Sequence, residues 1–158
     1  MDWHQRKSSK GFSLLELVIV VVIIGIIGAI AIPRMSRGSA GASDAALTGN
    51  LAIMRAAIDL YSAEHDGAFP LVATAEAELT QYTDAAEQTS PVRTITHIFG
   101  PYLRKIPPLP VGAKKGCTVI AAVDGIDVGW IYDETSGDIT ANCDATEMDA
   151  TDKLYSSY

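Results

Sequence analysis

The chain has 158 residues, 48% of them hydrophobic, which leaves room for one modest domain with appendages and not for two full cores. Its 12 basic and 19 acidic side chains give a net charge of −7, which argues against nucleic acid as the main partner because phosphate binding needs a basic face. Two cysteines are too few for a disulfide-rich scaffold, and the three histidines (His4, His65 and His97) are not at metal-ligand spacing.

The charges are distributed unevenly along the chain. Residues 1–11 hold three basic side chains and one acid, whereas residues 38–158 hold 7 basic and 17 acidic side chains. The stretch between them, residues 12–32, is apolar and would span about 31 Å as a helix, enough to cross a bilayer. The basic residues before it predict a cytoplasmic N-terminus and an acidic domain on the other side of the membrane.

One carboxylate, Glu16, interrupts this apolar stretch. A charged side chain at the centre of a membrane helix costs about 2.5–3.5 kcal/mol, and less near its end. No basic residue lies between 12 and 32, but a cut between Gly11 and Phe12 would expose a new α-amine as a counter-ion. Glu16 also suits the positive end of the helix dipole. The alternative is a carboxylate that simply reaches the lipid headgroups.

Residues 10–17, Lys-Gly-Phe-Ser-Leu-Leu-Glu-Leu, and the β-branched run that ends at Pro33 resemble the class III signal of type IV pilins and type II secretion pseudopilins. The resemblance implies that a prepilin peptidase cleaves after Gly11 and that Phe12 becomes an N-methylated first residue. It also implies that Glu16 pairs with the N-terminal amine of an adjacent subunit during filament assembly. An ordinary secretory signal cleaved after the Ala-Ile-Ala of 29–31 is the alternative, but it places an acid inside the h-region.

The apolar stretch ends at a proline and a run of small residues. Pro33 predicts a cap or kink, and residues 36–43 predict a hinge or a loose helical joint. The resemblance to pilins also implies a hinge, because in their filaments the helix often loosens between a glycine and this proline. Gly25, Gly28 and Pro33 would permit such loosening here. A plain linker between membrane and domain is the alternative.

A second helical pattern follows, so that one long helix, with a break allowed at 33–43, is expected from residue 12 to about 65. Residues 74–90 predict a short exposed helix, and 92–104 predict one or two further helical turns. Residues 102–110 contain three prolines and predict an extended segment, which is also similar to the one before the sheet in major pseudopilins. The expected core stripe of the long helix is Leu47, Leu51, Met54, Ile58 and Tyr61.

Three short strands are expected near the end of the chain, at 118–123, 128–132 and 138–141. The turn residues between them predict an antiparallel meander, and Trp130 and Tyr132 share the face that would pack on the long helix. The predicted fold class is therefore α+β and pilin-like: a long N-terminal helix, with a transmembrane first half, packed on a small antiparallel β-meander.

Cys117 and Cys143 bracket the predicted meander. Outside the cytoplasm they are expected to form a disulfide worth roughly 3–4 kcal/mol, with buried free thiols as the alternative. The acids between residues 124 and 152 lie in turns, where carboxylates suit calcium, although none follows the EF-hand pattern and solvated turns are the alternative. No other metal or cofactor is expected.

No nucleophile, phosphate-binding or zinc-protease motif is present, so the chain is not expected to be an enzyme.

The predicted organisation is a leader (1–11), a transmembrane and assembly helix (12–35) and a periplasmic domain (36–158). The predicted function is that of a pseudopilin, a filament subunit anchored in the inner membrane that pushes substrates of a type II secretion system across the outer membrane. Its expected partners are copies of itself, minor pseudopilins, prepilin peptidase, the inner-membrane assembly platform and lipid, without nucleic acid. The alternatives are a surface type IV pilin and a membrane-anchored or secreted binding domain that does not polymerise.

Overall fold

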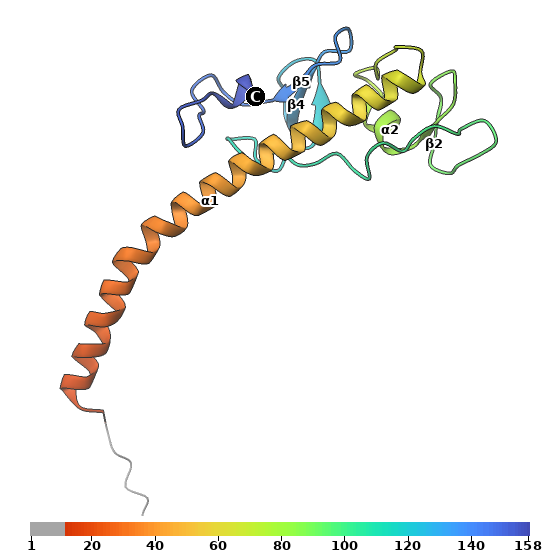
Figure 1. Cartoon of the computed structure of the whole chain (residues 1–158). Coiled ribbons are helices and arrows are strands. Elements are labelled where there is room, and N and C mark those ends of the chain that lie inside the picture. Colours follow the sequence, from red (N-terminus) through yellow and green to blue (C-terminus); the bar gives the residue numbers. More distant parts are fainter. Residues whose placement is uncertain (1–11) are drawn as a thin grey trace, which may run out of the picture. The chain divides into compact units, whose positions relative to one another are not determined.

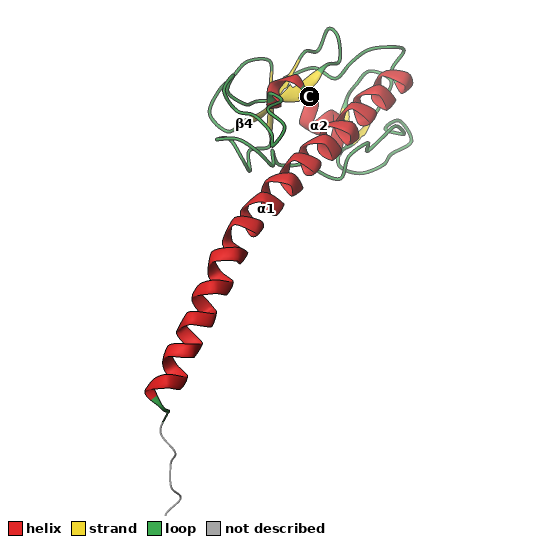
Figure 2. Cartoon of the chain, turned by 60° about the vertical axis from the view of Figure 1, so that its left-hand side comes forward, coloured by secondary structure: helices red, strands yellow, loops and turns green. Residues whose placement is uncertain are grey.

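The computed structural model describes residues 12–158, except for the side chains of residues 31–39 (Figures 1 and 2). Contacts divide the chain into two compact units, Met1–Ser39 and Ala40–Tyr158, and the second is called the globular unit below. The elements in chain order are α1 (Leu14–Glu64), α2 (Ala75–Thr80), β1 (Tyr82–Thr83), β2 (Thr89–Ser90), β3 (Val119–Ala121), β4 (Val128–Tyr132), β5 (Ile139–Ala141) and the 3-10 helix η1 (Tyr155–Ser157).

Helix α1 is continuous from Leu14 to Glu64. The backbone is helical through Pro33 and residues 36–43, so the break that the sequence allowed there is absent, whereas the predicted kink at Pro33 stays a prediction. A proline removes one hydrogen bond to the preceding turn, and the bonds of the flanking residues keep the helix intact. A Cβ added at Gly25 or Gly28 would meet nothing within 4 Å, so neither glycine is required by close packing within the chain. Their predicted hinge role in a filament stays a prediction.

The first half of α1 is apolar around its whole circumference. Between Leu14 and Ile30 the only polar side chain is that of Glu16, and nearly all side chains there are exposed. Among the described residues, no helix offers an apolar stretch long enough to cross a bilayer. The predicted span of 12–35 extends into residues whose side chains are not described, and it stays a prediction.

The core of the globular unit lies between the second half of α1 and a small sheet (Figure 1). All five predicted stripe residues of α1 are buried, as are Trp130 and Tyr132 of β4, which confirms the face predicted for each element. The α+β class and the packing of a long N-terminal helix on a small sheet are thus confirmed. The predicted stripe and its partners in the core are Leu47, Leu51, Met54, Ile58, Tyr61, Leu103, Ile106, Leu109, Trp130, Tyr132 and Ile139.

The sheet has the order β3-β4-β5 and is not wholly antiparallel. β4 and β5 pair antiparallel as predicted, with Trp130 opposite Ala141, but β3 runs parallel to β4. The six residues 122–127 carry the chain back to the start of β4 instead of forming a tight hairpin. Asp124 in this connection accepts hydrogen bonds from Lys114 and from Asn142, whose amide also donates to the carbonyl of Val128 (2.8 Å). These contacts with distant residues hold the connection in place.

The segment between α1 and the sheet differs from its prediction in two places. The helix predicted over 74–90 is only α2, and its Ala75 and Leu79 are buried and not exposed. The helical turns predicted over 92–104 are absent, because Phe99 pairs with Thr83 in a β-bridge and the residues before it form a loop. Residues 102–110 form no helix, as their prolines predicted, and the carbonyl of Pro107 accepts a hydrogen bond from the indole of Trp130 (2.9 Å).

Helix α1 ends at Glu64, close to the predicted residue 65, and two residues with left-handed backbone follow, Asp66 (φ 54°) and Gly67 (φ 90°). His65, the residue after the end of α1, is buried. Its ring stacks on Tyr61 with centroids 4.0 Å apart, and its two nitrogens contact the Tyr61 carbonyl and the Thr83 hydroxyl. His65 therefore belongs to the core, and its burial separates it from Asp66, which is exposed.

Candidate processing and assembly site

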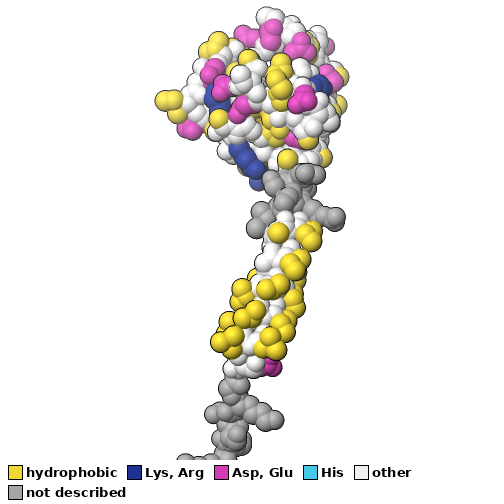
Figure 3. Space-filling model, turned by 90° about the vertical axis from the view of Figure 1, so that its left-hand side faces the viewer, with side chains coloured by type: hydrophobic (Ala, Val, Ile, Leu, Met, Phe, Trp, Pro, Cys, Tyr) yellow, Lys and Arg dark blue, Asp and Glu magenta, His cyan; other side chains and the backbone are white. Residues whose placement is uncertain are grey.

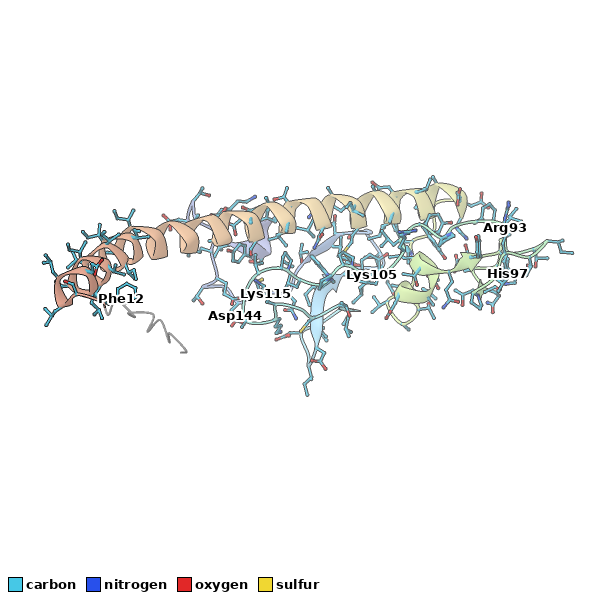
Figure 4. All side chains as sticks on the ribbon, turned by 90° about the horizontal axis from the view of Figure 1, so that it is seen from below. Phe12, Arg93, His97, Lys105, Lys115 and Asp144 are labelled. Atoms are coloured by element: carbon cyan, nitrogen blue, oxygen red, sulfur yellow. The ribbon has the colours of Figure 1, made fainter. Side chains whose placement is uncertain are left out.

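The predicted processing site lies at the start of the described chain. Gly11 falls outside the described residues, so the structure does not describe the scissile bond. Phe12 lies two residues before the first residue of α1, and it is 87% exposed (Figure 4). No described residue therefore covers this aromatic ring, and it is accessible to another molecule.

Glu16 closes a capping box at the beginning of α1. Its carboxylate accepts a hydrogen bond from the backbone N–H of Ser13 (3.0 Å), and the hydroxyl of Ser13 accepts one from the N–H of Leu15 (3.1 Å). Two of the N–H groups that every helix leaves unpaired at its start are thereby satisfied. The spacing Ser-x-x-Glu is the sequence signal of this motif, and the prediction for Glu16 did not include it.

This capping places the charge where an assembly partner can reach it. Only Oε2 of Glu16 is engaged among the described residues, and the side chain is exposed. The carboxylate is held at the N–H of Ser13, the residue that follows Phe12, and lies at the positive end of the helix dipole. Phe12 and Glu16, two of the predicted site residues, therefore both lie at the start of α1, four residues apart.

The helix surface beyond Glu16 is suited to apolar surroundings. Its Leu, Val and Ile side chains between 14 and 30 are about half exposed or more, and Figure 3 shows them covering the visible face of the helix. Burying an aliphatic side chain of this size is worth about 1.5–3 kcal/mol. Lipid tails or the same helices of other subunits would both remove this surface from water.

The two cysteines are free thiols in the structure, so the predicted disulfide is not formed. Both side chains are partly buried, Cys143 beside Gly112 and Glu147. Burial, together with the charge and hydrogen bonding of Glu147, raises the pKa of the Cys143 thiol to about 12. Since the thiolate is the species that attacks in disulfide exchange, this environment keeps the thiol unreactive.

Acidic side chains near the end of the chain accept hydrogen bonds within turns of the structure. Asp133 accepts hydrogen bonds from the N–H and hydroxyl of Thr135 (2.8 and 2.6 Å), and these bonds lower the pKa of Asp133. The pKa of Asp149 is also lowered, and the largest cause is its hydrogen bond from the Tyr158 hydroxyl. The pKa of Asp124 is lowered chiefly by its hydrogen bond from the ammonium of Lys114. Within residues 12–158, no three His, Cys, Asp or Glu side chains converge in the way that a metal site of such ligands requires.

Comparison with known proteins agrees with the N-terminal signal. Residues 6–32 match the family model described as the prokaryotic N-terminal methylation motif, which is the signature of type IV pilins and pseudopilins. The matched range includes Gly11, Phe12 and Glu16. No curated protein and no solved structure matched the chain.

Proposed function

Because this motif marks a type IV pilin-like protein processed by prepilin peptidase, we propose that the chain is a structural subunit of the pilus-like filament of a type II secretion system. Its role is mechanical and not enzymatic. The mature chain begins at Phe12, stays in the inner membrane through α1 until assembly, and carries the globular unit in the periplasm. Minor pseudopilins and the inner-membrane assembly platform are its further partners.

The observation that carries the proposal is the methylation motif, with Glu16 four residues after the processed position. A carboxylate there is disfavoured in lipid unless a cation neutralises it. Cleavage after Gly11 creates such a cation at Phe12. Since Oε2 of Glu16 already accepts the N–H of Ser13, Oε1 is the atom available to the amine of a neighbouring subunit.

Two interactions then direct assembly, the burial of the apolar surface of α1 and the charge pair at Glu16. The apolar surface of α1 is solvated equally well by lipid tails and by other α1 helices, so it permits transfer from membrane to filament without specifying register. The charge pair between Glu16 and a neighbour's amine does specify register, because a subunit placed elsewhere leaves a charge unpaired. Growth of the polymer would push cargo toward the outer membrane.

Secretion is favoured over a surface pilus by two segments that resemble pseudopilins. These are the helix exit, residues 61–70, and the extended segment that begins at Tyr102 and contains Ile106-Pro107. The runner-up is a surface type IV pilin. One observation favours it: two cysteines bracket the sheet region, as in many pilins.

The test of the proposal is the mass of the native N-terminal peptide, purified from membranes. An N-methylated Phe12 is expected. A first residue of Met1 or Ile32 would contradict processing at this site and with it the polymer. The control is the same measurement on a strain that lacks prepilin peptidase, in which the unprocessed chain should accumulate.

A second experiment separates secretion from a surface pilus. Deleting the gene for this chain should leave secreted proteins in the periplasm while surface adhesion and motility persist. The opposite pattern would assign the chain to a surface pilus. Restoring the wild-type gene should restore whichever function was lost.

A further inference from the structure

One loop of the globular unit, residues 92–98, is held by its own polar groups and leaves its apolar side chains exposed. In the 92–98 loop, Thr94 accepts hydrogen bonds from the N–H of His97 (3.0 Å) and of Thr96 (3.3 Å), and its N–H donates to the His97 carbonyl (3.3 Å). The bridge between Thr83 and Phe99 closes the base of the loop. These bonds define the loop conformation without any apolar packing.

The apolar side chains of this loop are left in solvent. Ile95 is 97% exposed and Val92 66%, and Ile98 is half exposed. A soluble surface rarely holds such residues together on an ordered loop unless another surface covers them. Because the loop is already ordered by its own hydrogen bonds, docking it costs little further conformational entropy.

The loop also carries an isolated cation. Arg93 is the only Lys or Arg between Arg55 and Arg104, a stretch that contains seven Asp or Glu residues. Among the described residues no ion pair engages Arg93. Figure 4 shows Arg93 and His97 at the end of the globular unit where α1 finishes, with Lys115 and Asp144 toward the other end.

The complementary surface is an open pocket of about 440 Å³ beside β4. Its lining includes the apolar residues Val72, Ala122 and Ile131 and the acidic residues Asp133 and Glu134. Glu134 uses Oε2 to accept the N–H of Val72 (2.8 Å), and no described residue bonds to its Oε1. The pocket therefore offers an apolar hollow next to an available negative charge.

We propose that the 92–98 loop of one subunit docks into this pocket of a second copy of the same chain, with Ile95 in the hollow and Arg93 against Glu134. The high exposure of Ile95 shows that it does not occupy the pocket of its own chain. Loop and pocket are different surfaces, so their contact is head-to-tail and repeats from copy to copy, which is the kind of contact that builds an open helical polymer. The inference rests on the proposed filament and adds a contact between globular units to the one at Glu16.

The test is cross-linking in filaments of the full chain, assembled by its own machinery. Ile95 and Ala122 are both exposed, so Ile95→Cys combined with Ala122→Cys leaves the core intact. Oxidation should join successive subunits into a ladder of oligomers on a denaturing gel. Each single variant and the parent chain, which keeps Cys117 and Cys143, are the matched controls and should give no ladder.

A charge and packing series measures the same contact. Ile95→Asp and Arg93→Glu should each lower the yield of sedimented filaments about tenfold, whereas Ile95→Val and Arg104→Glu should leave it unchanged; a tenfold loss corresponds to about 1.4 kcal/mol per contact. Filaments that form normally but give no ladder overturn this inference and leave the proposed function standing. A parent chain that is processed but never polymerises overturns both.

Discussion

Two roles of Glu16, capping its own helix and pairing with a neighbour's amine, can be separated by one substitution. Glutamine also completes a capping box, since its side-chain oxygen accepts the Ser13 N–H in the same way. Glu16→Gln therefore keeps the 3.0 Å contact to Ser13 but removes the charge, and Glu16→Ala removes both. If assembly depends on charge, both variants should remain in the membrane without forming filaments.

The two roles also differ in size. Losing a helix cap costs about 1 kcal/mol, roughly a fivefold effect. Losing a charge pair about 4 Å apart in an environment of effective dielectric constant 20 costs about 4 kcal/mol, or nearly a thousandfold. Ser13→Ala is the matched control, because it removes the other arm of the capping box and keeps the charge, so filament yield should fall only severalfold.

The assay is the fraction of chain that sediments as filaments, with N-terminal processing checked by mass spectrometry. Processing should be normal in all three variants. Normal filaments from Glu16→Gln together with few filaments from Ser13→Ala would refute the charge-pair reasoning, because that result would make Glu16 a helix cap only.

Three further predictions concern the globular unit. Met54→Ala, at a position with no exposed area, should lower the free energy of unfolding by about 2–5 kcal/mol in thermal or urea denaturation, whereas the same change at Ile53, 57% exposed, should cost far less. The pKa of Asp124 in the folded chain is below its ordinary 3.8. The ionised carboxylate therefore stabilises the fold above that pH, and this contribution is lost as the pH falls through the folded-state pKa. Asp124→Asn should make the melting temperature fall less steeply with pH on the acid side. Cys143, with its raised pKa of about 12, should react with iodoacetamide at pH 8 only after unfolding, and with Cys117 it should give a count of two free thiols.

Each of these has a contrary outcome. Equal losses from the changes at 53 and 54 would mean that the helix packs through a different face. An unchanged acid transition in Asp124→Asn would remove the role of this carboxylate in holding the β3–β4 connection. A native mass two hydrogens below that of the chain with two free thiols, with thiols appearing only after reduction, would show that Cys117 and Cys143 form a disulfide.

The sequence alone was sufficient wherever the signal is local. The processing motif occupies a few consecutive residues, and a helix records its buried face as a repeat of three and four residues, so Leu47 through Tyr61 could be assigned without the structure. The prolines of 102–110 excluded helix for the same reason, since their effect acts on neighbouring residues. The capping role of Glu16 was also readable from Ser-x-x-Glu, although it was missed.

Only the tertiary structure decided what depends on residues distant in the chain. The direction of β3 is set by a connection held by Lys114 and Asn142, which no periodicity within 119–132 could reveal. Phe99 is drawn into a bridge with Thr83, which converts an expected helix into a loop and leaves Ile95 exposed. Pairing across many residues depends on which surfaces meet, and a short sequence window contains only one side of each such contact.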